Sequence, residues 1–381
     1  MKRRRFFWSA QAVTVLMHAV PLLALGTVLS WVASTLVALG LWATTATRLL
    51  RLGPDQRRPH WVTRWVDEPL CCHWAASLLG SALFVPFALI TLGLRGWSAL
   101  PGAALWAYAT GLICAAWGTW GRRRWVVVRN LDLPLARLPN ELEGYRVAQL
   151  SDLHIGSFDG PRAGARWVRR TNTLKPDLVV VTGDLVTSGT EFYTDAAEVL
   201  SGLQAPDGVI CILGNHDQWD AGRFEAALRA RGLTVLSNDS RVIRRGEAAL
   251  VIAGLGDPYT EKADLVATLR GRIAGAPTIL LSHYPEWFEA AAREQVELVL
   301  SGHTHGGQLG VPFLADRFNL ATLTRQRPRG LFRSGASWLY VNAGLGTTGP
   351  PVRLGVAPEI ALFALRSESG TAGAGRTKME P

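Results

Sequence analysis

The chain has 381 residues, of which 48% are hydrophobic, and it carries a formal net charge of +10. This length allows two or three domains. The four cysteines lie in or beside apolar runs, which argues against a disulfide framework. Because most basic residues flank apolar segments, the charge favours contact with anionic lipid over binding of nucleic acid.

Four apolar segments in the first third of the chain are long enough to cross a membrane, at residues 6–27, 29–50, 74–94 and 99–120. The first two come from one stretch, Phe6 to Leu50, in which Arg48 is the only charged residue. That stretch is too long for one span and suits two. Residues 1–125 are therefore expected to form a membrane domain with a bundle of about four transmembrane helices.

Lysines and arginines mark one side of this predicted bundle. They fill residues 2–5, recur between residues 48 and 64, and follow the fourth span at residues 122–124, whereas Arg95 alone falls on the opposite side. By the positive-inside rule, an even number of spans places everything after Arg124 on the cytoplasmic face of the inner membrane. The lipid bilayer is then an expected partner.

Two alternatives reverse this orientation. Residues 3–7, three arginines before two phenylalanines, also match a twin-arginine export signal, although a cleaved signal gives no reason for three further spans. In the second alternative, one predicted pair of spans is instead a single long or re-entrant helix, with possible breaks at Pro21 and Gly26. The number of spans is then odd.

Residues 126–144 form a predicted linker and edge strand, because prolines interrupt the short apolar pieces there. Predicted strands then alternate with helices. The strands cover residues 145–150, 178–182, 209–213, 250–255, 278–281, 296–300, 338–341 and 359–365, and the helices cover residues 162–174, 194–203, 223–231, 265–273 and 288–294. Residues 233–236 and 241–244 are expected to pair as a hairpin that turns at residues 237–239.

This alternation predicts an α/β domain at residues 145–366. Strands that are apolar throughout should be buried on both faces, and the hairpin predicts a mixed sheet. Residues 306–337 show little periodicity. The tail at residues 367–381 is rich in glycine, serine and threonine and is expected to be disordered.

Polar residues follow the predicted strands at the point where each strand ends. Five of the eight histidines are among them, and each one alone has an ordinary explanation as a turn, core or surface residue. Because the carboxyl ends of strands in an α/β sheet gather functional groups, together they indicate one site. The candidates are Asp152, His154, Asp184, Asn215, His216, His283, His303 and His305.

The chemistry of these side chains indicates a metal site. Imidazoles, carboxylates and one amide oxygen suit Mn²⁺, Fe²⁺ or Zn²⁺, and the lack of cysteine ligands argues against a structural zinc site. Seven ligands that share one carboxylate could hold two ions, which can clamp a phosphoryl group and activate water for in-line attack on phosphorus. His216 would then be free to serve the leaving group.

These residues occur in five blocks whose order resembles the motifs of the calcineurin-like metallophosphoesterase superfamily. The blocks are Asp152-x-His154, Gly183-Asp184, Gly214-Asn215-His216-Asp217, His283 and Gly302-His303-x-His305. Further blocks, including His283-Tyr284-Pro285 and Gly306-Gly307-Gln308, resemble its membrane-linked bacterial branch of YkuE and YaeI phosphoesterases. The resemblance covers about residues 145–365 and implies a four-layer α-β-β-α sandwich with mixed sheets.

The resemblance also implies roles for the matching residues. Asp152, His154 and His305 would bind the first metal ion and Asn215, His283 and His303 the second, with Asp184 as the bridge and Mn²⁺ as the expected ion. His216 would protonate the leaving oxygen, and Asp217 would orient its imidazole. The implied activity is that of a metal-dependent phosphoric ester hydrolase of the phosphodiesterase or pyrophosphatase type.

The surroundings of the last block suggest a lipid-linked substrate. Residues 311–333 combine apolar side chains with five arginines, and Arg325 and Arg329 are candidates to bind phosphate. Arg353 is a third, because the family often carries an arginine just before the final Gly-Leu-Gly, where this chain has Asn342 and Ala343. The alternatives are a solvated loop for the segment and a surface position for Arg353.

Tethering to a bilayer would hold the site near lipid head groups. The expected substrate is therefore a phosphodiester or pyrophosphate in a nucleotide-activated lipid such as UDP-diacylglucosamine, or in a phospholipid. Two other functions stay open, which are hydrolysis of soluble nucleotides and a non-enzymatic metal-binding sensor. The full set of predicted ligands argues against the sensor.

Overall fold

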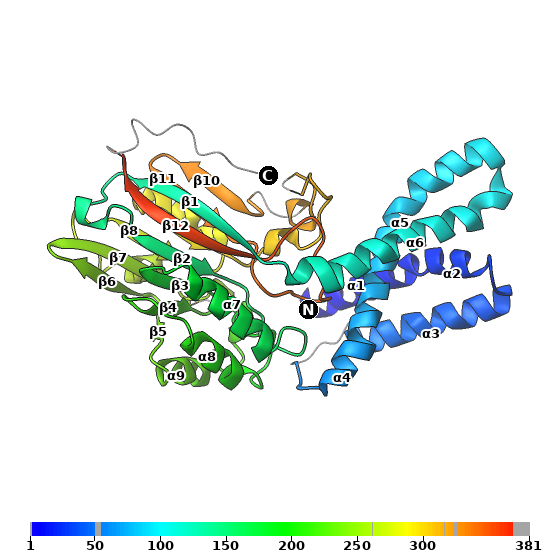
Figure 1. The fold of residues 1–381 in the computed structure, drawn as a ribbon, viewed down its shortest axis with the longest axis horizontal. Coiled ribbons are helices and arrows are strands. Elements are labelled where there is room, and N and C mark those ends of the chain that lie inside the picture. The colour runs from blue at the N-terminus through cyan, green and yellow to red at the C-terminus, as the bar shows by residue number, and fades with distance from the viewer. Residues whose placement is uncertain (1, 50–54, 261, 316, 324–326, 369–381) are drawn as a thin grey trace. The chain divides into compact units, whose positions relative to one another are not determined.

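The structure is a computed structural model that describes residues 2–49, 55–260, 262–315, 317–323 and 327–368. The described residues form two compact units, drawn in Figure 1. A helical unit holds the N-terminal helices up to Arg124 together with Gly349–Leu354, and a sheet unit holds residues 55–57, Trp125–Thr348 and the chain from Gly355 onward. Of the tail predicted at residues 367–381, residues 369–381 lie outside the described residues.

The helical unit consists largely of apolar helices. The α-helices are α1 (Lys2–Met17), α2 (Ala19–Leu25), α3 (Trp31–Leu49), α4 (His60–Val62), α5 (Glu68–Arg95) and α6 (Leu100–Ala116). They are continued by the π-helical segments η1 (Thr63–Asp67) and η3 (Trp117–Gly121) and by the 3-10 segments η2 (Trp97–Ala99) and η4 (Arg122–Arg124). Two continuous stretches, His60–Arg95 and Trp97–Arg124, are long and apolar enough to cross a membrane, with mean hydropathies of 2.0 and 1.4. They contain the predicted spans 74–94 and 99–120.

The other two predicted spans fall on shorter apolar helices, Gln11–Leu25 and Trp31–Thr47. The first of these is interrupted at His18, between α1 and α2. Pro21 accounts for the interruption, because it has no N–H to donate to the carbonyl of Met17. Among the described residues, two stretches are therefore long and apolar enough to span a membrane, and the count of four stays a prediction.

A buried chain of polar side chains links three helices of this unit. The Nδ1 atom of His18 lies 2.7 Å from the carbonyl oxygen of Thr14, and its Nε2 atom lies 3.1 Å from Nε2 of His73. The Nδ1 atom of His73 is in turn 2.8 Å from the hydroxyl of Tyr108. Each imidazole thus has polar partners on both nitrogens, which offsets the cost of burying it among apolar helices.

Glu68, at the start of α5, is a buried carboxylate with several donors. Arg64, Arg123 and the indole N–H of Trp120 each donate a hydrogen bond to it at 2.8 Å. A buried carboxylate needs such partners, because an unpaired charge is costly to remove from water. Part of the basic flank that was expected to meet lipid head groups therefore neutralises this side chain.

The sheet unit contains two mixed six-stranded sheets, with strand orders β1-β12-β2-β3-β4-β5 and β10-β11-β9-β8-β7-β6. Mixed sheets confirm the prediction, and β1 lies at an edge as expected. The strands are β1 (Val127–Leu135), β2 (Arg146–Leu150), β3 (Leu178–Thr182), β4 (Val209–Ile212), β5 (Thr234–Val235), β6 (Asp239–Arg245), β7 (Ala248–Gly254), β8 (Thr278–Leu281), β9 (Leu298–Ser301), β10 (Gly330–Ser334), β11 (Ser337–Val341) and β12 (Glu359–Ser367).

Both faces of the central strands are buried, as their continuous apolar sequences indicate. In β3, Val180 joins a core shared by the inner faces of the two sheets, whereas Val179 and Val181 join a core beneath helices. Helices cover the first sheet on one side, and two short helices pack on the second sheet. They are α7 (Pro161–Thr173), α8 (Tyr193–Ser201) and α9 (Ala221–Arg229), then α10 (Leu265–Thr268) and α11 (Phe288–Arg293).

The predicted hairpin of residues 233–236 and 241–244 is wrong. The first segment becomes β5, which pairs in parallel with β4 in the first sheet. The second becomes part of β6, which pairs antiparallel with β7 in the other sheet. The tight turn lies instead between β6 and β7, where Gly246 adopts a φ of +57°.

Residues 55–57 belong to the sheet unit although they lie between α3 and α4 in the chain. The backbone N–H of Asp55 donates to the hydroxyl of Ser188 at 2.9 Å. The Asp55 carboxylate accepts hydrogen bonds from the backbone N–H and the hydroxyl of Ser157, at 2.9 and 2.7 Å. Ser157 and Ser188 lie in the loops that follow β2 and β3, so Asp55 joins these two loops.

Asp55→Ala should therefore destabilise the sheet unit. The substitution leaves the backbone N–H of Ser157 without its acceptor, whereas the Ser157 hydroxyl can still donate to the carbonyl of Gln56 at 2.9 Å. We expect a loss of about 1 to 2 kcal/mol in the free energy of unfolding. Denaturant unfolding of the full chain in detergent measures this loss. Asp132→Ala is the control, because Asp132 is 65% exposed and pairs with the exposed Arg366. Equal unfolding midpoints for the two variants would contradict the assignment.

Candidate metal centre

The predicted ligands lie just beyond the ends of five strands from both sheets. Asp152 and His154 follow β2, Asp184 follows β3, and Asn215 and His216 follow β4 in the short turn η6 (Asn215–Asp217). His283 follows β8 in the second sheet, and His303 and His305 follow β9. Strands β2, β3 and β4 are parallel, as are β7, β8 and β9, so each set delivers its polar residues to one edge.

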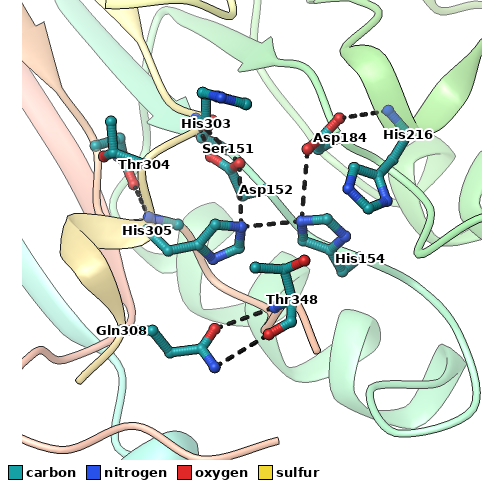
Figure 2. A network of polar contacts seen from close by, with 12 residues as sticks. Ser151, Asp152, His154, Asp184, His216, His303, Thr304, His305, Gln308 and Thr348 are labelled. Carbon is teal, nitrogen blue, oxygen red and sulfur yellow. Dashed lines mark hydrogen bonds and ion pairs between the residues drawn. The ribbon is translucent and has the colours of Figure 1, made fainter. Parts of the chain in front are cut away.

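These side chains form three overlapping clusters of potential metal ligands. The clusters are Asp152 with His154 and His305, His154 with Asp184 and His216, and Asp184 with His283 and His303, and within each the ligand atoms lie within 4.8 Å of one another. Figure 2 shows the His154 and His305 imidazoles facing each other, with their Nε2 atoms 3.0 Å apart. Asp184 and His154 each belong to two clusters, so the three clusters form one connected site.

Asp184 and Asp152 sit close to the imidazole nitrogens. One oxygen of Asp184 is 3.3 Å from Nε2 of His283 and 3.6 Å from Nε2 of His154. An oxygen of Asp152 is 3.4 Å from Nε2 of His305, and the Asp152 carboxylate accepts the backbone N–H of His303 at 3.0 Å. Carboxylates and imidazoles from distant parts of the chain therefore lie close enough together to bind a common metal ion.

The backbone at this site is strained. Asp152, His154, Asp184, His303 and His305 all have φ between +45° and +68°, a region that side chains other than glycine rarely adopt. Each such residue costs of order 1 to 3 kcal/mol, and the surrounding structure must compensate. Five of the seven predicted ligands share this conformation. Strain concentrated on one set of residues is typical of a functional site.

Glycines next to the ligands allow the close approach. A Cβ atom on Gly214 would lie 2.5 Å from the backbone nitrogen of Asp184 and 2.9 Å from Nε2 of His283. A Cβ on Gly302 would collide with Ser151 and the Asp152 carboxylate. These two glycines, which form part of the sequence blocks, therefore have a steric function.

Burial and charge shift the pKa values of the ligands. Burial raises the pKa of Asp152 to about 6, although the nearby His283 acts in the opposite direction. Burial alone would lower the pKa of His283, but Asp184 and Asp152 raise it to about 10. Burial and the cationic His283 lower the pKa of His303 to about 3. The protonated form is thus favoured at His283, which lies beside Asp184.

The residues fit divalent metal ions. Their donors are imidazole nitrogens, carboxylate oxygens and an amide oxygen, which first-row divalent ions accept. The Nε2 atom of His283 is buried and makes no hydrogen bond to any residue that the structure describes, although it faces the Asp184 oxygen. That nitrogen and that oxygen could both serve as ligands of one metal ion.

The resemblance implies that Asp217 orients the His216 imidazole, and the structure shows a different arrangement. The Nδ1 atom of His216 faces the carbonyl oxygen of Thr187, and its backbone N–H donates to Asp184 at 2.9 Å. The buried Asp217 carboxylate instead accepts backbone N–H groups of Gly214, Leu185 and Val186 at 2.9 to 3.1 Å. Asp217 thus joins the loops after β3 and β4, and the carbonyl of Thr187 orients the His216 imidazole.

The three candidate arginines have different surroundings. Arg325 lies outside the described residues. Arg329 lies beside Gly306, which directly follows the ligand His305; a Cβ on that glycine would be 2.8 Å from Cδ of Arg329. Arg353 is fully buried and belongs to the helical unit, where its backbone N–H donates to the carbonyl of Gly118 at 3.2 Å. A surface position for Arg353 is therefore excluded.

Sequence reasoning missed two residues of the site, Thr187 and Tyr284. Thr187 supplies the carbonyl partner of His216 and donates its hydroxyl to the carbonyl of His154 at 2.9 Å. A backbone carbonyl leaves no trace in the sequence. Tyr284 donates to the side chain of Asn215 at 3.1 Å, and its position directly after His283 was the available signal.

Comparison with known proteins places this geometry in a family. Residues 145–307 match the family model described as calcineurin-like phosphoesterase. The chain is 30% identical over 271 residues to "Uncharacterized metallophosphoesterase YkuE" of Bacillus subtilis (strain 168), which covers 68% of this chain and 94% of that protein. It is 30% identical over 255 residues to an "Uncharacterized metallophosphoesterase" of Aquifex aeolicus (strain VF5), covering 63% of this chain and 92% of that protein.

A vertebrate relative carries the same domain. The chain is 34% identical over 255 residues to a "Transmembrane protein with metallophosphoesterase domain" of Danio rerio, covering 63% of this chain and 57% of that protein. The chain thus spans little more than half of that relative and nearly all of the two bacterial proteins.

Metal affinity at this site should rise with pH. Asp152 and His283 hold protons at low pH that a metal ion must displace, because only their deprotonated forms are ligands. Mn²⁺ binding to the metal-free protein should therefore tighten from about pH 5 to pH 8 and release protons. Calorimetry in buffers of different ionisation enthalpy measures both quantities. An affinity that is constant over this range would contradict the ligand assignment.

Proposed function

Because the chain belongs to the calcineurin-like metallophosphoesterase family, we propose that its sheet unit is a metal-dependent phosphoester hydrolase. The observation that carries the proposal is the overlap of the three ligand clusters at Asp184 and His154. Two divalent ions are proposed, with Mn²⁺ as the first choice and Fe²⁺ or Zn²⁺ as alternatives. Cleavage of a diester or pyrophosphate bond is the proposed reaction.

The proposed ligands divide between the two ions. Asp152, His154 and His305 would hold the first ion, Asn215, His283 and His303 the second, and Asp184 would contact both. When bound, such ions supply Lewis acidity toward a phosphoryl group. The ligand loops exclude water from the far side of the site, since Asp152, His154 and Asp184 are all buried.

His216 is the proposed proton donor to the leaving oxygen. The carbonyl of Thr187 faces Nδ1 and can accept its proton, so Nε2 is the ring nitrogen left to serve the leaving oxygen. The ring also lies edge-on to the His154 ring, with centroids 4.8 Å apart. Nε2 is then the atom that holds the proton to be transferred.

His216→Ala should separate catalysis from metal binding. We expect kcat to fall by about 10²- to 10⁴-fold, because the leaving oxygen loses its proton donor. Metal content by elemental analysis should stay at the wild-type value, since the first and second sets of ligands are intact. Hydrolysis at an unchanged rate would remove His216 from the mechanism, and a loss of both ions would make it a ligand.

The proposed substrate is lipid-linked, a nucleotide-activated lipid resembling UDP-diacylglucosamine or a phospholipid. The support is a run of exposed apolar side chains soon after the last ligand loop, namely Val311, Phe313, Leu314, Phe318 and Leu320. Phe313 is fully exposed, at 105%, and holds a φ of +66°. Exposed apolar clusters of this kind favour contact with another apolar phase. Arg329 beside Gly306 is the proposed phosphate contact.

A substrate comparison tests this proposal. Mn²⁺-loaded full-length protein in detergent is offered lipid diphosphates, a soluble chromogenic diester and soluble nucleotides. We expect higher kcat/KM for a lipid, and Phe313→Ser should lower this value for the lipid alone, because the chromogenic diester has no acyl chain. A preference for soluble nucleotides over every lipid would contradict the lipid proposal and favour the alternative function of a nucleotide phosphodiesterase.

The proposed location is the inner membrane, with four spans and the sheet unit on the cytoplasmic face. Two stretches are long and apolar enough to cross a membrane, and relatives are named as transmembrane proteins. Protease added to intact spheroplasts should leave the sheet unit uncut, and lysis should expose it. Digestion before lysis would indicate an odd number of spans or export.

A further inference from the structure

Tyr284 is held firmly between a proposed ligand and a proline. It follows His283 and precedes Pro285, which begins the short turn η8 (Pro285–Trp287). A residue before proline is restricted to extended backbone, and Tyr284 has φ −96° and ψ +128°. The Ser282 hydroxyl donates to the Tyr284 carbonyl oxygen at 2.9 Å. The backbone that carries the phenol is therefore well defined.

The side chain of Tyr284 contacts three proposed ligands of the second ion. Its hydroxyl donates to Oδ1 of Asn215 at 3.1 Å. Its ring lies over the His303 ring, with centroids 4.1 Å apart and an angle of 39° between the planes. The ring also stands edge-on to His283, with centroids 5.2 Å apart. One side chain thus joins the loops after β4, β8 and β9.

We propose that Tyr284 is a positioning residue for the second metal ion, an inference that rests on the dinuclear centre of the proposed function. A side-chain amide can present either its oxygen or its nitrogen, and only the oxygen is a ligand. In this structure the phenol hydroxyl donates to Oδ1, which holds the amide in this orientation and leaves the second lone pair of Oδ1 available. The ring contact limits the rotation of the His303 imidazole.

The proposed ligand sets show why such support is needed on this side of the site. The second ion would have one neutral amide and two imidazoles besides the shared Asp184, whereas the first would also have the carboxylate of Asp152. A set with fewer charges attracts a cation less strongly, so it depends more on correct orientation of its donors.

Mn²⁺ titration of the metal-free full chain tests the inference without any substrate. Electron paramagnetic resonance of unbound Mn²⁺ counts the ions that the protein takes up. Wild type should bind two. Tyr284→Phe keeps the ring and removes the hydroxyl, so one ion should bind as in wild type and the other about 10-fold more weakly. Tyr284→Ala, which also removes the ring contact with His303, should weaken that ion further.

Tyr145→Phe is the matched control. It removes a phenol hydroxyl that donates to Asp207 at 2.6 Å in the same unit, and Tyr145 belongs to none of the three ligand clusters. This variant should bind both ions like wild type. Circular dichroism melting of each variant shows whether it is folded.

Three results would overturn the inference. Unchanged binding of both ions by Tyr284→Phe would show that the hydroxyl does not position a ligand. Equal weakening of both ions would show that its effect is not confined to the second. Fewer than two ions in wild type would contradict the dinuclear centre itself, and this failure is recognised because it appears without any substitution.

Discussion

The Asp184 carboxylate contacts histidines from loops of both sheets. It is buried, it lies 3.3 Å from His283 of the second sheet, and it lies 3.6 Å from His154 of the first. Its other oxygen accepts the backbone N–H of His216. Burial alone would raise the pKa of Asp184, but His283 and His216 hold it well below its usual range. An ionised group at this depth requires partners that offset its charge, and the surrounding loops supply imidazoles and a backbone N–H group.

Hydrogen bonds from residues outside the proposed ligand set hold the loops after β2, β3 and β4 in this arrangement. Asp217 accepts backbone N–H groups from the loops after β3 and β4, and Asp55 joins the loops after β2 and β3. Without such contacts the positive φ angles of the ligands would relax, because each is unfavourable by itself. The strained backbone and its supports therefore form one structure, which places imidazoles where free loops would not.

Each unit also includes a short segment from a distant part of the chain. Residues 55–57 belong to the sheet unit, and Gly349–Leu354 belongs to the helical unit. The first segment contacts the loops that carry proposed ligands, although it precedes the region that matches the family model by about 90 residues. Support for the proposed metal centre thus extends beyond the part of the chain by which the family is recognised.

Much of this protein follows from its sequence. The apolar strands, most of the helices and the eight polar residues at strand ends were predictable, because burial on both faces gives continuous apolar runs and ligands are drawn from few residue types. Only the tertiary structure decided how the strands pair and which groups contact the eight polar residues. The pairing of β5 and β6 with different sheets, the carbonyl of Thr187 beside His216, and the phenol of Tyr284 on Asn215 depend on contacts between distant segments. Such contacts leave no pattern in the local sequence, because tertiary packing and not the neighbouring residues determines which atoms come together.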